Sequence, residues 1–271
     1  DHSDGNLIFP PLLSDGSIYN YSFVGVDYAG NKSDTLIIES LRYDVTEPVI
    51  MVSSPVDGDY LNEILPSFSF SEDMLESIIT WTQIGGEDDV NSPHQSVLTG
   101  NELLSGDHVK TALLNLPALV DGAIYSVSFS GLDLAGNNAE EVFIDKITYD
   151  ITSPVIAISS PESNIFIDKP VISFSTSEDL SSGEFLWKDL RNSTNNLSIK
   201  LSNSLKVAGN YPEIDFSDSL NLVDGSAYRI LMTAEDLAGN IAEPVSIVNV
   251  GYDTSPPTLT IDYPSEGDYI N

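Results

Sequence analysis

The stretch LVDGAIYSVSFSGLDLAGNNAEEVFIDKITYD, residues 119–150, decides the fold of this chain. Apolar residues and serine alternate over residues 125–130, which is the pattern of a strand with one buried face. Residues 142–149 predict a second strand that runs back, with a bulge between its two apolar pairs. The pentapeptide DLAGN (133–137) between them is therefore expected to be a hairpin loop, whose glycine supplies a positive φ.

The same phrases occur three times. DYAGN (27–31), DLAGN (133–137) and DLAGN (236–240) begin at aspartates that are 106 and 103 residues apart (133 − 27 and 236 − 133). A tyrosine lies eight residues before each of these aspartates, and another aspartate lies seventeen residues after it. This spacing predicts a repeated domain. The segments are the C-terminal half (strands E to G) of a truncated domain (1–44), complete domains at 45–150 and 151–253, and the first strand of a following domain (254–271).

Further short strands are expected upstream of each hairpin. PVIMVSSP and PVIAISSP begin the two complete domains, PSFSFSED and VISFSTSED follow, and a stretch with Trp81 or Trp187 comes next. No segment carries a sustained helical period. About 100 residues per unit, many short strands and one tryptophan in the third strand are typical of an immunoglobulin-like sandwich. We therefore predict an all-β chain of tandem immunoglobulin-like β-sandwich domains in a linear array.

The phrase Leu-x-Asp-Gly-x-x-Tyr, which precedes each hairpin, supports this fold. It resembles the tyrosine corner of fibronectin type III and related sandwiches, in which the phenol bonds back to the backbone between strands E and F. Tyr19, Tyr125 and Tyr228 hold the corresponding position. The resemblance implies that the strand after the corner is F, that the pentapeptide is the F–G loop and that the last strand is G. Residues 1–44 lack strands A to C, so alone they cannot close a sandwich.

The composition excludes several classes of function. There are 42 Asp and Glu against 10 Lys and Arg, a net charge of -32, which is too negative for binding nucleic acid or an anionic membrane surface. Without cysteine, neither disulfides nor thiolate metal sites are possible. No apolar run approaches the roughly 20 residues of a membrane span, and the chain starts at Asp1, as expected of an internal segment. Cations are the natural partners of such a chain.

Acidic residues recur where the topology brings the end of one domain close to the loops of the next. The linker after strand G, the B–C loop and the F–G loop are expected to converge there. Carboxylates gathered without basic partners repel one another, and a hard cation removes the repulsion. Ca²⁺ accepts about 6–8 oxygens in flexible geometry whereas Mg²⁺ requires a tight octahedron, so we expect Ca²⁺. The candidate ligands are Asp44, Glu72, Asp73, Asp133 and Asn137 at one junction, and Asp150, Glu178, Asp179, Asp236 and Asn240 at the next.

A simpler reading of these acidic residues stays open. Asp and Asn are ordinary turn formers, so the pentapeptide can be only a good hairpin loop, and the acidic surface can serve only solubility. The recurrence of acids on both sides of the same expected junction favours the cation.

Together, these units resemble the bacterial Ig-like (BIg) tandem repeats of large calcium-binding surface adhesins, the extender domains of type I-secreted adhesins. The resemblance covers both complete domains and, through its F–G half, the leading fragment. It implies a structural stalk segment at the cell surface, stiffened by Ca²⁺ at interdomain junctions. It also implies that the partners are neighbouring repeats of the same chain, and that a domain outside this segment binds the surface ligand. Asp44, Asp133, Asp150 and Asp236 match best, and the shifted prolines of YDTSPP (252–257) depart from the pattern.

An enzyme is not expected. The histidines are His2, His94 and His108, and none has a counterpart in the other repeats. The repeats therefore share no catalytic histidine. Asp88 and Asp89 form a carboxylate pair that could do acid–base work, but we expect a solvated loop there.

Two other functions of the same fold stay open. One is an Ig-like module of a secreted multidomain protein that binds a ligand or carbohydrate, because the segments between the tryptophan and the tyrosine corner differ most between repeats. Against this, we expect Trp81 and Trp187 to be buried in the cores rather than exposed for stacking. The other is homophilic adhesion in the manner of cadherins, although nothing in the chain resembles the cadherin linker.

Overall fold

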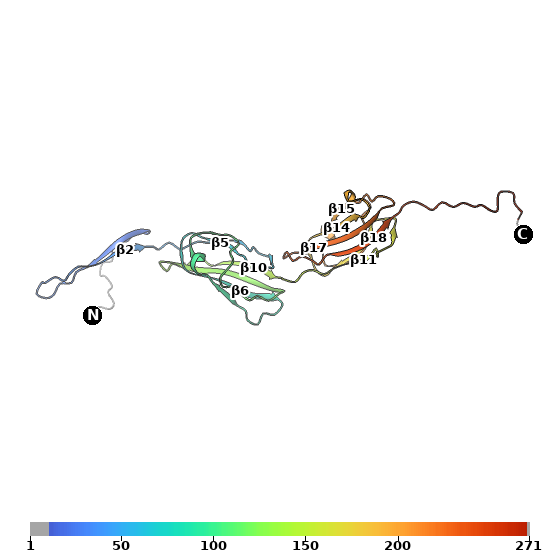
Figure 1. Ribbon diagram of the computed structural model, residues 1–271. Coiled ribbons are helices and arrows are strands. Elements are labelled where there is room, and N and C mark those ends of the chain that lie inside the picture. The colour runs from blue at the N-terminus through green and yellow to red at the C-terminus, as the bar shows by residue number, and fades with distance from the viewer. Residues whose placement is uncertain (1–10, 270–271) are drawn as a thin grey trace. The chain divides into compact units, whose positions relative to one another are not determined.

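The structure is a computed structural model that describes residues 11–269. The chain folds as two compact units, Asp1–Asp150 and Ile151–Asn271. Within the described residues the elements are eighteen β-strands and three short 3-10 helices (Figure 1). None of the helices there is long and apolar enough to cross a membrane.

The first unit contains a hairpin and a two-sheet body, the first sandwich. The hairpin consists of β1 (Ser17–Phe23) and β2 (Leu36–Tyr43). The sandwich consists of β3 (Ile50–Ser54), β4 (Tyr60–Leu61), β5 (Ser67–Phe70), β6 (Met74–Gly86), β7 (His94–Val97), η1 (Gly100–Leu103), β8 (Gly106–His108), β9 (Ala123–Asp133) and β10 (Val142–Tyr149). Its sheets have the orders β3-β5-β8 and β4-β10-β9-β6-β7. Neighbouring strands pair antiparallel except β4, which runs parallel to β10.

The second unit repeats this arrangement in the second sandwich (Figure 1). It consists of β11 (Ile156–Ser160), β12 (Phe166–Ile167), β13 (Val171–Thr176), β14 (Leu180–Asp189), η2 (Ser193–Asn195), β15 (Leu197–Lys200), η3 (Asn203–Leu205), β16 (Gly209–Asp215), β17 (Ala227–Asp236) and β18 (Val245–Tyr252). Its sheet orders are β11-β13-β16 and β12-β18-β17-β14-β15, and β12 again runs parallel to the last strand. The prediction of an all-β chain of tandem β-sandwiches is confirmed, while the division into four segments stays a prediction.

Each sandwich encloses its own hydrophobic core between its two sheets. In the first, Tyr125, Val127 and Phe129 of β9 are fully buried and belong to one cluster with Trp81 of β6. In the second, β17 alternates in the same way and packs with the fully buried Trp187. The predicted burial of both tryptophans is confirmed, so neither indole face is available to stack on a sugar.

The last strand of each hairpin carries the expected bulge. Pairing between β9 and β10 shifts register between Ile144 and Ile147, and β2 and β18 shift at the same place in the repeat. The residue within the break has left-handed backbone, with φ of 62° at Ser40, 62° at Lys146 and 58° at Asn249. Because one extra residue is accommodated there, the apolar residues on both sides of the break face the same core.

The tyrosine corner is present in all three copies. In each copy the phenolic oxygen accepts a hydrogen bond from the backbone N–H five residues upstream, over 2.8 Å at Tyr19, 2.9 Å at Tyr125 and 2.8 Å at Tyr228. These bonds confirm the corner predicted from Leu-x-Asp-Gly-x-x-Tyr. They fix where β1, β9 and β17 begin relative to the loop before each strand.

The hairpin β1–β2 has the same bulge and corner as the two sandwiches but not their burial. Phe23 is 59% exposed and Leu36 is 70% exposed, whereas Phe129 of β9 is 0% exposed. Within the described residues these two strands form a sheet of their own. The local sequence is thus sufficient to specify the hydrogen bonds of the hairpin, while burial of its apolar face requires the other strands of a sandwich.

Candidate metal centre

The pentapeptide loop is held by its own aspartate. In the first sandwich Asp133 Oδ1 accepts the N–H groups of Ala135 and Asn137 at 2.8 Å each, and Oδ2 accepts the side-chain amide of Asn137 at 2.7 Å. Asp27 and Asp236 bind the asparagine four residues further on in the same way. The glycines of the three loops have φ of 88°, 91° and 94°, as predicted. Local loop geometry therefore accounts for part of the repeat.

Three of the proposed ligands come together in the first unit. Asp44 follows β2, Glu72 follows β5 and Asp133 ends β9, so they come from the linker, the B–C loop and the F–G loop. One carboxylate oxygen from each lies within 4.8 Å of the other two. Asp133 is buried, and the other two are partly exposed. This arrangement offers three anionic oxygens from three separate segments.

The carboxylates of this cluster differ in the direction in which their pKa values are shifted. Burial, together with the charges of Asp44 and Asp133, raises the pKa of Glu72 above its usual value. Burial also opposes ionisation of Asp133, but hydrogen bonds from Asn137 outweigh it and hold the pKa of Asp133 below its usual value. Among residues 11–269 no lysine or arginine forms an ion pair with any of the three carboxylates. Within the described residues, no ion pair therefore balances the negative charge of this cluster.

The cluster borders an open hollow of about 490 Å³, whose lining includes Asp44, Glu72, Arg42 and part of the pentapeptide loop. The side-chain nitrogen of Asn137 donates to Asp133 and also to the backbone oxygen of Asp44 at 3.3 Å. An amide nitrogen donates hydrogen bonds and does not coordinate cations, so only the amide oxygen of Asn137 can act as a ligand. Its assignment as a ligand stays a prediction.

The second acidic residue of each B–C loop has a partner of its own. Asp73 Oδ1 accepts the backbone N–H of Ser105 at 2.8 Å, just before β8. Asp179 Oδ1 accepts the backbone N–H of Ala208 at 2.8 Å, just before β16. The three-carboxylate cluster does not include Asp73. These bonds tie the B–C loop to the strand beside β5 or β13 in the smaller sheet, and the assignment of both residues as ligands stays a prediction.

The remaining candidates are the corresponding residues one repeat further along the sequence. Asp150 ends the first unit, where its backbone N–H donates to the carbonyl of Leu61 at 2.9 Å. Glu178 lies in the B–C loop of the second sandwich, and the buried Asp236 ends β17. The side-chain amide of Asn240 donates to Asp236 at 2.8 Å. That these residues share a cation stays a prediction.

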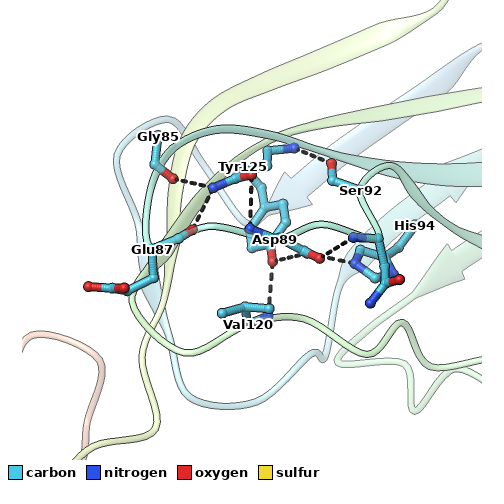
Figure 2. Close-up of polar contacts among 9 residues, drawn as sticks. Gly85, Glu87, Asp89, Ser92, His94, Val120 and Tyr125 are labelled. Atoms are coloured by element: carbon cyan, nitrogen blue, oxygen red, sulfur yellow. Dashed lines mark hydrogen bonds and ion pairs between the residues drawn. The ribbon is translucent and has the colours of Figure 1, made fainter.

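A buried polar network in the first sandwich was missed by the sequence reasoning (Figure 2). Asp88 is exposed, but Asp89 is only 4% exposed, so the prediction of a solvated loop is wrong for Asp89. Asp89 Oδ2 accepts the phenolic O–H of Tyr125 at 2.7 Å and lies 2.6 Å from Nε2 of His94. Because a carboxylate only accepts, the ring nitrogen that faces it carries a hydrogen. The physical reason for burial is that these two donors replace water around the carboxylate.

The loop that carries Asp89 closes on Gln83. The N–H of Asp89 donates to Gln83 Oε1 at 3.1 Å, and the hydroxyl oxygen of Ser92 accepts the N–H of Gln83 at 2.8 Å. The hydrogen bond from Tyr125 holds the pKa of Asp89 below its usual value, and burial raises the pKa of Tyr125 to about 12. The network thus joins an ionised carboxylate to a neutral phenol. No strand pattern or spacing in the sequence marks these residues as partners.

Comparisons with known proteins concern the fold. No protein-family profile and no curated protein sequence matches this chain. The fibronectin(III)-like modules of Clostridium thermocellum CbhA share 13% identity at a TM-score of 0.38, covering 79% of this chain and 100% of theirs. The FN1-FN3 domains of chicken CNTN1 share 13% identity at a TM-score of 0.34, covering 87% and 76%. A tetra-tandem repeat in the extending region of a large adhesion protein shares 17% identity at a TM-score of 0.31, covering 87% of this chain and 56% of that one.

Proposed function

We propose that this chain is an extender segment of an extracellular bacterial surface protein, and that Ca²⁺ binds to Asp44, Glu72 and Asp133. The observation that carries the proposal is the convergence of three carboxylate oxygens within 4.8 Å of one another. The linker, the B–C loop and the F–G loop each supply one of them, so a bound ion would join the linker to the sandwich. In the next repeat the corresponding sequence positions are Asp150, Glu178 and Asp236.

The donor set suits a hard cation. All three groups are carboxylates, without nitrogen or sulfur donors, so zinc and copper are poor candidates. Ca²⁺ tolerates variable geometry and fills its coordination with carbonyl oxygens and water, which suits ligands carried on loops. Burial and the charges of Asp44 and Asp133 raise the pKa of Glu72, and a bound cation would offset the part that comes from those charges.

The linker supports a mechanical role. β2 ends at Tyr43 and β3 begins at Ile50, and the buried Pro48 lies between them. Proline fixes its own φ and restricts the residue before it, so this short connection has few conformations. A cation held by Asp44 on the linker and by two loops of the sandwich would restrict it further. The chain would then act as a stiff spacer rather than as a ligand-binding module.

Thermal unfolding of the whole chain tests the cation. We expect the midpoint to rise in millimolar Ca²⁺ relative to chelator, and to rise much less in equal Mg²⁺, because a ligand that binds only the folded state stabilises it. Equal midpoints in all three solutions would overturn the proposal and favour a spacer without cations or a ligand-binding module.

A matched pair of variants locates the ion. Glu72→Gln keeps the size of the side chain but removes a charge from the cluster, and we expect calorimetric titration to show one Ca²⁺ fewer per chain. Glu76→Gln is the control, because Glu76 is exposed on β6 and its side chain makes no hydrogen bond within the described residues. Equal stoichiometry in the two variants would contradict the assignment of Glu72.

A further inference from the structure

The aspartate of the corner motif Leu-x-Asp-Gly accepts hydrogen bonds from the linker that follows its own repeat. In the first copy, Asp15 Oδ1 accepts the backbone N–H of Val45 at 2.8 Å, and Oδ2 accepts the hydroxyl of Thr46 at 2.5 Å. The N–H of the corner glycine donates to the carbonyl at the end of β2 at 2.9 Å, which holds the corner against that strand. The carboxylate of Asp15 therefore contacts the two residues that follow Asp44.

The last copy of the motif repeats this contact atom for atom. Asp224 Oδ1 accepts the backbone N–H of Thr254 at 2.7 Å, and Oδ2 accepts the hydroxyl of Ser255 at 2.9 Å. The corner glycine again donates to the carbonyl at the end of the last strand, β18, at 2.8 Å. The shifted prolines of the third linker do not alter the arrangement. Two copies with different linker residues thus converge on one geometry.

The aspartate that follows the last strand of the repeat also accepts a hydrogen bond from the linker. Asp44 Oδ1 accepts the N–H of Thr46, and Asp253 Oδ1 accepts the N–H of Ser255, each at 3.0 Å. Thr46 therefore donates its N–H to Asp44 and its O–H to Asp15. Ser255 donates in the same way to Asp253 and Asp224. Hydrogen bonds to a carboxylate are about twice as strong as neutral ones. Together these hydrogen bonds define the path of the chain where it leaves β2 and β18.

We propose that Asp15 and Asp224 are positioning residues that set this path without any cation, and that Asp15 thereby orients Asp44 toward Glu72 and Asp133. The first part of the proposal is independent of the proposed function. The second part rests on it, since it concerns the ligand that the linker contributes.

Amide hydrogen exchange on the whole chain in chelator tests the first part. We expect Asp15→Ala to speed exchange of the Val45 N–H by about tenfold, and Asp224→Ala to do the same for Thr254, since each loses a charged acceptor. The controls are Asp34→Ala and Asp218→Ala, because both carboxylates are exposed and make no hydrogen bond in the described part of the chain. Linker exchange rates that match those of the controls would overturn the proposal.

Calcium affinity tests the second part with a variant that keeps every charge. Thr46→Val removes only the hydroxyl that donates to Asp15, and we expect it to weaken Ca²⁺ binding by about tenfold, as loss of a group that orients a ligand does. Ser255→Ala removes the matching hydroxyl, which donates to Asp224 in the second unit, and should leave the affinity at Asp44 unchanged. Equal affinities in these two variants would overturn the orienting role of Asp15. If the unmodified chain binds no Ca²⁺, the proposed function fails, while the exchange experiment still decides the first part.

Discussion

Each sandwich buries an aspartate near its tyrosine corner, Asp89 in the first and Asp189 in the second, at 4% and 5% exposure. The two carboxylates are satisfied in different ways. Asp89 lies beyond the end of β6 and relies on the side chains of Tyr125 and His94 (Figure 2). Asp189 is the last residue of β14 and pairs in register with Tyr228 of β17.

Asp189 relies mainly on its own loop. Its Oδ1 accepts the N–H groups of Arg191 at 2.8 Å and Asn192 at 3.1 Å, and Oδ2 accepts the hydroxyl of Ser226 at 3.2 Å. Burial opposes ionisation, but these bonds outweigh it, so the pKa of Asp189 lies below its usual value. One fold thus offers two solutions to the same desolvation problem. Asp89 accepts hydrogen bonds mainly from two side chains, with one loop amide from Asn91, and Asp189 accepts two loop amides together with the hydroxyl of Ser226.

The largest expected losses of stability come from removing each carboxylate. Asp89→Ala should destabilise the first sandwich by about 3 kcal/mol, because it leaves the buried Tyr125 hydroxyl without its acceptor. Asp189→Ala should cost the second sandwich about 2 kcal/mol, because loop amides can turn to water. Urea unfolding with Trp81 or Trp187 as the single fluorophore measures each sandwich separately.

Asp88→Ala is the control for Asp89→Ala, because Asp88 is exposed, and it should change stability by less than about 0.5 kcal/mol. Equal losses from Asp89→Ala and Asp88→Ala would contradict the network in Figure 2.

Removing the corner hydroxyls should give a smaller loss of stability in each sandwich. Tyr125→Phe loses a bond from Val120 and a bond to Asp89, so we expect a loss of about 2 kcal/mol. Tyr228→Phe loses the bond from Val223, for about 1 kcal/mol. The same fluorescence measurement applies, and a loss from Tyr228→Phe that equals or exceeds that from Tyr125→Phe would mean that Asp89 adds nothing to the corner.

High pH should lower the stability of the first sandwich relative to that of the second. The pKa of Tyr125 is raised to about 12, against about 10 in an unfolded chain. A raised pKa contributes stability that is complete below about pH 10 and is lost as the pH rises through about 12. The unfolding midpoint of the first sandwich should therefore fall between pH 10 and 12, and Tyr125→Phe should flatten that fall. An unchanged slope in the variant would show that another group titrates.

Low pH should give the smallest difference in stability between the two sandwiches. The pKa values of both Asp89 and Asp189 lie below their usual value, so each contributes stability that is present above about pH 4 and is lost as the pH falls through the folded-state pKa. Both sandwiches should lose stability in acid. Asp89→Asn should reduce the acid slope of the first sandwich and leave that of the second unchanged. A change in both slopes would indicate a general charge effect.

The regular parts of the fold could be predicted because their signals are local. The alternation around Val127, the glycine of each pentapeptide and the tyrosine of each corner act within a few residues, and the repeat showed each signal three times. The positions of Asp44, Glu72 and Asp133 followed from sandwich topology, since that topology decides which loops lie at the same end.

The remaining details depend on side-chain orientation and loop closure. Asp89 lies in an irregular segment, and only closure of that loop on Gln83 brings it to Tyr125. Asn137 was expected as an oxygen ligand, but the direction of its amide is set by hydrogen bonds to Asp133 and the linker. Neither the closure of this loop nor the direction of this amide produces a periodic pattern in the sequence.

The two-residue strands β4 and β12 determine how much backbone each sandwich leaves open at the edge of its larger sheet. They cover β10 and β18 at one end, where Tyr60 and Leu61 pair with Thr148 and Tyr149 in the first sandwich. The bulge around Lys146 bends the remainder of that edge. A short, bent edge is a poor template for a foreign strand. Repeats as alike as these could otherwise exchange strands, and the small parallel strand together with the bulge makes such an exchange less favourable at this edge.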